Sequence, residues 1–178
     1  MIDAAIVVAL ANVQAPRRSA GARAAMARDP LADAVSASAL LEPFLNQPIA
    51  EPDLGVARAV QQAVLAIVDA LIDKADPPLQ PLNALAAREP VIQALQPGAN
   101  GTLHATSQPE HQSATASLLL AVMVELSELA PPRLRRCARP ECGLVFYDTS
   151  RSATQRWHAD RPCGMRERQR RYRRNHPA

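Results

Sequence analysis

Three cysteines and one histidine near the carboxyl end of the 178-residue chain constrain its fold more than any other feature. Cys137 and Cys142 are separated by four residues, fifteen residues follow, and His158 and Cys163 are again separated by four. Zinc takes four sulfur or nitrogen ligands in a tetrahedron, and two close pairs can supply them without a large core. The spacing therefore predicts one structural zinc ion. Because catalytic zinc keeps one position open for water, a closed site of this kind disfavours an enzyme.

The fourth ligand decides whether the predicted site is closed. His158 is the expected donor, Asp160 is the alternative, and His176 is too near the end of the chain. An odd number of cysteines in one short segment is a poor disulfide framework, so we expect a reducing compartment, the cytoplasm. No apolar run approaches the roughly 18 to 20 residues that span a bilayer, and we expect no membrane partner.

Charge changes sign along the chain. Residues 1–132 carry 7 basic and 13 acidic side chains, a net charge of −6, whereas residues 133–178 carry 13 basic and 4 acidic side chains, a net charge of +9. All 13 basic residues of the second segment are arginines, and Lys74 is the only lysine of the chain. Since the planar guanidinium group suits phosphate oxygens and guanine edges, a polyanion is the first partner to expect. Charge, cysteine content and arginine density change together, which predicts two domains, 1–132 and 133–178.

The first domain is predicted to be mainly helical with a small β element. Residues 53–74 form the clearest amphipathic helix, with Asp53 as its N-cap. Other helices are expected over 31–45, 82–95 (broken near Pro90) and 114–129, with a strand over 102–106. Residues 2–13 form an apolar element of uncertain type, residues 15–21 a loop and residues 97–101 a turn.

The second domain is predicted to be a small α+β zinc finger, treble-clef-like, made of a knuckle, a β-hairpin and an arginine-rich helix. The hairpin is expected between the two ligand pairs because residues 144–147 have strand character, and Cys163 is expected at the start of the last helix. Like charges repel along that helix, so it needs the zinc site at its start and a polyanion along its length. The residues predicted to contact nucleic acid are Arg151, Arg156, Arg166, Arg168, Arg170, Arg171, Arg173 and Arg174.

A longer motif surrounds the four ligands. Arg-Arg precedes Cys137, Gly follows Cys142, Phe-Tyr-Asp-Thr-Ser-Arg occupies 146–151, Trp precedes His158, and Cys-Gly-Met-Arg occupies 163–166. This motif resembles the CGNR zinc finger family. His158 stands where that family commonly has Cys, and Met165 stands where it has Asn. The resemblance implies that residues 1–132 form an ABATE domain and that the protein is a transcription regulator of the stress response.

Several functions fit these observations. The first is a cytoplasmic transcription regulator that binds duplex DNA. Residues 1–132 would then be a sensor of an unknown small molecule or an assembly domain. Their acidic charge could also bring them against the basic helix. The second is an RNA-binding or protein-interaction module with a purely structural zinc. A solvated tail and a helix on an anionic membrane surface are alternatives for the last segment. An enzyme is disfavoured because His104 and His111 lack a partnered nucleophile. A homodimer is left open.

Overall fold

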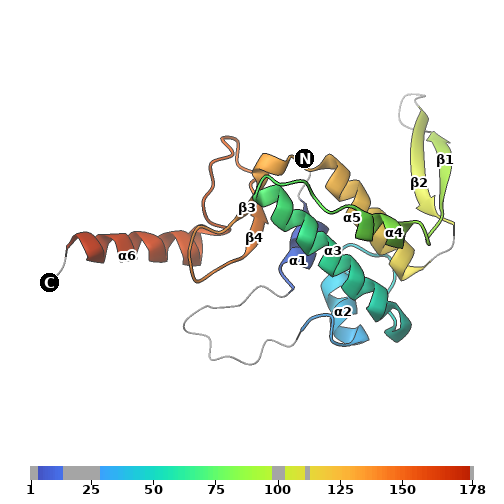
Figure 1. Cartoon of the computed structure of the whole chain (residues 1–178), viewed down its shortest axis with the longest axis horizontal. Coiled ribbons are helices and arrows are strands. Elements are labelled where there is room, and N and C mark those ends of the chain that lie inside the picture. Colours follow the sequence, from blue (N-terminus) through green and yellow to red (C-terminus); the bar gives the residue numbers. More distant parts are fainter. Residues whose placement is uncertain (1–3, 14–28, 98–102, 111–112, 177–178) are drawn as a thin grey trace.

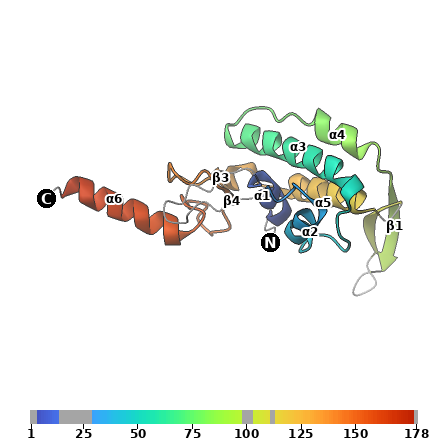
Figure 2. The same cartoon turned by 90° about the horizontal axis from the view of Figure 1, so that it is seen from below.

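The computed structural model describes residues 4–13, 29–97, 103–110 and 113–176. Within these ranges five helices form a body, which one small sheet joins to a sixth helix at the carboxyl end (Figures 1 and 2). A second two-stranded sheet extends from the opposite end of the body (Figure 1). The helices are α1 (Ala5–Ala11), α2 (Ala34–Leu41), α3 (Leu54–Ile72), α4 (Gln80–Ala86), α5 (Ala114–Glu128) and α6 (Met165–Asn175), and the strands are β1 (Val91–Pro97), β2 (Leu103–Pro109), β3 (Leu134–Arg136) and β4 (Val145–Tyr147).

Helix α3 is the centre of the body, because it contacts α1, α4, α5 and β3. Val60, Val64 and Ile67 of the predicted apolar stripe are buried in the core, which confirms this helix and its inward face. Asp53 does stand immediately before α3, but its side chain does not cap that helix. Its carboxylate accepts a 3.1 Å hydrogen bond from the Ala50 amide and so closes the short 3-10 turn that precedes α3.

Two other predicted helices are shorter than expected. The helix predicted over 31–45 is α2, whose first turn is capped by Asp33 accepting a hydrogen bond from the Ser36 amide at 2.8 Å. The helix predicted over 82–95 is wrong beyond α4, since residues 91–97 form strand β1. Pro90 explains the break, because proline disfavours helical geometry at the residue before it and lacks an amide hydrogen. Strand β1 pairs antiparallel with β2, with Val91 opposite Pro109 and Pro97 opposite Leu103.

The remaining predictions for the body are confirmed where the structure describes them. The apolar element at 2–13 contains α1, and the helix predicted over 114–129 is α5, capped by the Ser113 hydroxyl. The strand predicted over 102–106 is β2, which runs on to Pro109. The predicted loop 15–21, the part of the predicted turn that follows Pro97, and His111 lie outside the described residues.

The segment Glu51–Ile72, which contains α3, is long and apolar enough to cross a membrane, with a mean hydropathy of 1.5. The same residues form the core of the body, where Ala57, Val60, Val64 and Val68 are fully buried. A core helix of a globular protein satisfies the same length and composition, so α3 is weak support for a membrane span. The cytoplasmic location stays a prediction.

Strands β3 and β4 attach the carboxyl segment to the body. Leu134 of β3 and Val145 of β4 belong to the same buried cluster as α1 and α3. The side chain of Asn12, which follows α1, donates to the Val145 carbonyl at 2.9 Å and accepts from the Val145 amide at 2.8 Å. Arg136 forms an ion pair with Asp69 of α3. The two predicted domains therefore share part of one core, and the division into 1–132 and 133–178 stays a prediction.

Candidate metal centre

The four predicted ligands lie together. One ligand atom from each of Cys137, Cys142, His158 and Cys163 lies within 4.8 Å of the others. Nδ1 of His158 is 3.3 Å from Sγ of Cys142 and 3.7 Å from Sγ of Cys163. Zinc bonds of about 2.3 Å to sulfur and about 2.05 Å to nitrogen place the two atoms about 3.6 Å apart in a tetrahedron. The cluster fits one structural zinc ion held by three sulfur atoms and Nδ1 of the histidine.

Asp160, the alternative ligand, is engaged elsewhere, and so is His176. The carboxylate of Asp160 accepts two hydrogen bonds from the Arg168 guanidinium, at 2.8 and 3.0 Å. The ring of His176 stacks on Tyr172 near the end of α6, with the ring centroids 4.4 Å apart. Within the described residues, the cluster therefore has His158 as its only nitrogen donor.

Strand β3 and a tight turn position the first ligand pair. The Cys137 amide donates to the Leu144 carbonyl at 2.8 Å, and the Cys142 amide donates to the Arg139 carbonyl at 3.0 Å. Gly143 has a φ of 69°, in the left-handed region where glycine is not penalised. The prediction that the hairpin lies between the ligand pairs is wrong. Strand β4 pairs with β3, which precedes Cys137, so the hairpin encloses the first pair.

The second ligand pair is held by an irregular turn before α6. The Ala138 amide donates to the Arg156 carbonyl at 2.8 Å and so ties the two halves of the site together. The turn Asp160–Gly164 contains one extended residue, Arg161, and places Cys163 two residues before α6 begins. A Cβ at Gly164 would lie 2.5 Å from Oδ1 of Asp160 and 3.2 Å from Cε3 of Trp157, so a larger residue after Cys163 would require these side chains to move.

Burial sets the protonation of the metal-free ligands. Burial is the main cause that raises the pKa of Cys142 to about 12, and hydrogen bonds with the Cys137 and Cys163 thiols raise it further. Burial also lowers the pKa of His158, so its imidazole is neutral at pH 7. Zinc binds thiolates and neutral imidazole, so the histidine is ready to bind and Cys142 must release a proton.

Charged side chains around the cluster were not anticipated from the sequence. Nε of Arg139 donates a hydrogen bond to Oε2 of Glu141 at 3.1 Å. Burial lowers the pKa of Arg139, but its interactions with Cys163 and Glu141 outweigh burial and raise the pKa. Arg170 of α6 lies 3.6 Å from Glu141. A chain of charges thus joins the knuckle to α6, and a cation lies beside a site that carries a formal charge of −1 with zinc bound.

Asp148 anchors the loop between β4 and His158. Its carboxylate is fully buried and accepts hydrogen bonds from the Ser150 amide at 3.0 Å, the Ser150 hydroxyl at 2.5 Å and the Gln155 amide at 2.8 Å. Nε of Arg135 lies 3.6 Å from the same carboxylate. The sequence pattern Asp-Thr-Ser indicates a polar turn here, which the structure confirms, but the pattern does not show that the aspartate is buried.

The predicted nucleic-acid contacts are all exposed. Arg168 and Arg170 pair with acidic groups of the carboxyl segment. The other α6 arginines, and the loop residues Arg151 and Arg156, form no ion pair with the described residues. At 100° per residue, four arginines cover one face of α6. They are Arg166, Arg170, Arg173 and Arg174.

Comparison with known proteins agrees with the geometry of this site. A search of curated proteins found no match to the chain. A family match covers residues 133–176, which include all four ligands and the whole of α6. It does not extend into the body, so an ABATE domain there and a stress-related role stay predictions. The carboxyl segment of this chain is similar to the CGNR zinc finger family, and with its Cys3His cluster it is a zinc finger module.

Proposed function

We propose that the protein is a transcription regulator that binds duplex DNA through α6, with the zinc ion holding that helix in place. The observation that carries this proposal is the position of α6. The helix extends away from the body in both views (Figures 1 and 2), and its arginines are exposed. Among the described residues its ion pairs involve only acidic groups of the carboxyl segment.

The length and charge of α6 suit a groove of duplex DNA. Its 11 residues span about 16 Å at 1.5 Å per residue, and the major groove is about 12 Å wide. The face of Arg166, Arg170, Arg173 and Arg174 offers guanidinium groups to phosphates, which supply affinity without reading sequence. We propose that Arg151 and Arg156 extend the contact from the loop, and that Arg171 reaches a phosphate from the flank of α6. Arg168 projects from the opposite side of the helix and is bound by Asp160, so this orientation of α6 supports it least among the predicted contacts.

The body is proposed to act as a sensor or assembly domain and to catalyse no reaction. A closed zinc site leaves no position for a reacting water, which supports a structural role for the metal. The acidic body does not mask α6 in this structure, since the helix points away from it (Figure 2). A finger that binds structured RNA is the second candidate, supported by the same arginine face.

Salt dependence of DNA binding tests this proposal. The zinc-loaded protein is titrated into a labelled duplex at several salt concentrations, and anisotropy gives the affinity. With about five phosphates engaged, the log-log slope should be about −4 to −5. Replacing Arg166, Arg170, Arg173 and Arg174 by Gln should reduce the slope by about 3 to 4. Arg88→Gln, which removes an exposed cation from the body, is the control and should leave the slope close to that of the native protein.

Two further arms decide between the candidates. His158→Ala keeps every arginine but removes a zinc ligand, and should lose both the metal and tight DNA binding. A structured RNA is titrated in parallel with the duplex. Tighter binding to the RNA at equal salt would favour the second candidate, and binding without salt dependence would overturn both.

A further inference from the structure

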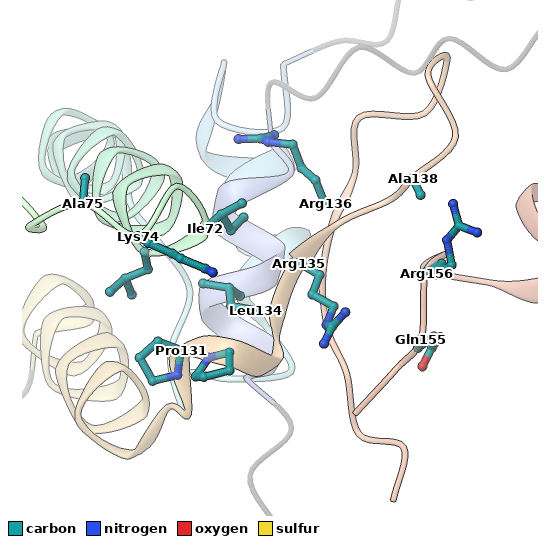
Figure 3. Close-up of a pocket in the computed structure, with 12 residues that line it drawn as sticks. Ile72, Lys74, Ala75, Pro131, Leu134, Arg135, Arg136, Ala138, Gln155 and Arg156 are labelled. Carbon is teal, nitrogen blue, oxygen red and sulfur yellow. The ribbon is translucent and has the colours of Figure 1, made fainter. Parts of the chain in front are cut away.

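A cavity of about 950 Å³ lies where the body meets the zinc finger (Figure 3). Its walls come from the end of α3, the turn before β3, β3 itself and the segment that leads to His158. This volume is at the upper end of the range for small-molecule sites. Of the described residues that line it, Arg156 alone belongs to the proposed DNA contact, and none is a metal ligand.

One wall of the cavity is apolar. Leu71 and Ile72 of α3 line it together with Pro131, Pro132 and Leu134, and Ile72, Pro131 and Leu134 lie near one another in Figure 3. Neither Leu71 nor Ile72 is fully buried, although both pack against the core. Hydrocarbon placed against this wall would leave water, which favours binding by about 25 cal/mol per Å² of apolar surface covered.

The rest of the lining is cationic. Lys74, Arg135, Arg136 and Arg156 contribute to it, and no acidic residue is among the described residues that line the cavity. Carboxylates outside the lining neutralise two of these cations, since Arg135 pairs with Asp148 and Arg136 pairs with Asp69.

Two cations of the lining lack a carboxylate partner among the described residues. They are Lys74 and Arg156. The Arg156 guanidinium lies over the Trp157 ring, with Cζ 5.4 Å from the ring centroid. The Lys74 side chain extends towards the middle of the lining (Figure 3). Lys74 and Arg156 stand at opposite ends of the lining, and Lys74 is the one beside Ile72, Leu134 and Pro131 (Figure 3). A cation beside an apolar surface without a carboxylate leaves a positive potential that an anion can neutralise.

The backbone at Lys74 is an independent indication of a role for this side chain. Lys74 follows α3 with a φ of 58°, in the left-handed region. The Ala75 amide closes the helix end by donating to the Ala70 carbonyl at 2.9 Å. Glycine is the preferred residue at such a helix end, and a side chain there is strained. Strained residues of this kind cluster at functional sites, and this one carries the only lysine of the chain.

We propose that the cavity binds an amphipathic organic anion, with its apolar part against Leu71, Ile72 and Pro131 and its carboxylate, sulfonate or phosphate group held by Lys74. Such a ligand contacts the body through the end of α3 and the turn before β3, and the carboxyl segment through β3 itself. The site goes beyond DNA binding, because Lys74 and the apolar wall have no part in the proposed α6 contact.

The chain contains its own optical reporter for this site. Trp157, the only tryptophan, is next to Arg156. The zinc-loaded full-length protein is titrated with the aryl sulfonate 8-anilinonaphthalene-1-sulfonate, and energy transfer from Trp157 to the dye gives the affinity. Lys74→Gly should weaken binding at least fivefold. Arg171→Gln, which removes an exposed cation of α6, should change it less than twofold.

Lys74→Gly also separates lost binding from lost folding. Glycine relieves the left-handed strain, so the melting temperature should stay the same or rise while dye binding weakens. Dye binding that is equal in Lys74→Gly and Arg171→Gln would overturn the proposal.

Competitors distinguish the sources of the anion. Dodecanoate should displace the dye, which supports an acyl carboxylate, and a nucleoside triphosphate that displaces it more strongly supports a phosphorylated ligand. If inorganic phosphate displaces the dye as well as dodecanoate or the nucleoside triphosphate does, the apolar part of the ligand is not needed and that half of the proposal is overturned. If dodecanol displaces the dye as well as dodecanoate does, the charge is not needed and the anionic half is overturned.

The DNA assay keeps this test independent of the proposed function. Lys74→Gly should bind duplex DNA with the native salt slope. Loss of dye binding with retained DNA binding supports the cavity site alone, whereas absence of DNA binding in both proteins counts against the proposed function alone.

Discussion

At the scale of single residues, Asp148 shows how a buried charge can hold a loop. Burial raises the pKa of this carboxyl, but hydrogen bonds from Ser150 and Gln155 and the charge of Arg135 outweigh it and hold the pKa below its usual range. A carboxyl whose folded pKa is depressed stabilises the fold above its unfolded pKa, and that stabilisation is lost as pH falls through the folded pKa. Asp148 should therefore contribute at neutral pH and progressively less in acid.

Asp148→Asn tests this contribution. Both carboxylate oxygens accept hydrogen bonds, so an amide nitrogen would face a donor at one of them. We expect the free energy of unfolding at pH 7 to fall by about 2 kcal/mol, and the difference from the native protein to shrink as pH falls below the usual aspartate range. Urea denaturation of the zinc-loaded proteins measures both effects. Asp76→Asn, at an exposed carboxylate with no ion pair to the described residues, is the control, and an equal loss in both variants would contradict the special role of Asp148.

Individual residues were predicted well where their chemistry is local. The three cysteine ligands follow from residue type and spacing, because zinc restricts both. The sequence left Asp160 as an alternative to His158 for the fourth ligand, and the structure brings His158 into the cluster. Asn12 and Asp69 could not be found in this way. Their partners, Val145 and Arg136, lie 133 and 67 residues away, and the residues themselves match no motif.

At the scale of elements, the zinc finger depends on a coupling between metal and protons. Cys142 is protonated at pH 7 in the metal-free protein because its pKa is about 12, and zinc displaces that proton. His158 is neutral at this pH and releases none.

The apparent zinc affinity should therefore rise at least about tenfold per pH unit between pH 6.5 and 7.5, since one or more protons leave per metal. Competition with a chelator of known affinity measures the change. Calorimetry in two buffers of different ionisation enthalpy counts the protons directly. An affinity that is constant over this range would show that Cys142 is already a thiolate before zinc binds.

Element types were predicted with mixed success, for physical reasons. Helix α3 has an unbroken apolar stripe, so its period identifies it. The period of strand β1 does not identify it, because Val91, Ile92 and Leu95 are spaced as on a helix and all three are exposed. Strand β3 was missed as the partner of β4, since Leu-Arg-Arg has no strand character without the neighbour that it pairs with.

At the scale of the whole molecule, the finger and the body are expected to unfold together. Asn12 pairs with both backbone groups of Val145, and Leu134 and Val145 complete a cluster that includes α1 and α3. Ligand binding to the folded state alone stabilises everything that unfolds in the same transition. Zinc should thus stabilise the helical body as well as the finger.

Asn12→Ala measures this connection. The substitution leaves the amide and carbonyl of the buried Val145 without their partners, and should lower the free energy of unfolding by about 2 kcal/mol. Circular dichroism at 222 nm follows the body, and metal release follows the finger. The two should report one transition, which a chelator shifts to lower temperature. Asn83→Ala on the exposed face of α4 is the control, and separate transitions for helix and metal would contradict a shared core.

The pairing of Asn12 with Val145 also sets an order of events during synthesis. The two residues are 133 positions apart, so a ribosome that adds about 5 to 20 residues per second needs about 7 to 27 s between them. Through that interval α1, and α3 after it has been made, lack the strands β3 and β4 that cover part of their apolar surface. The nascent body therefore stays incomplete, and accessible to chaperones and proteases, until the carboxyl segment leaves the ribosome and binds zinc.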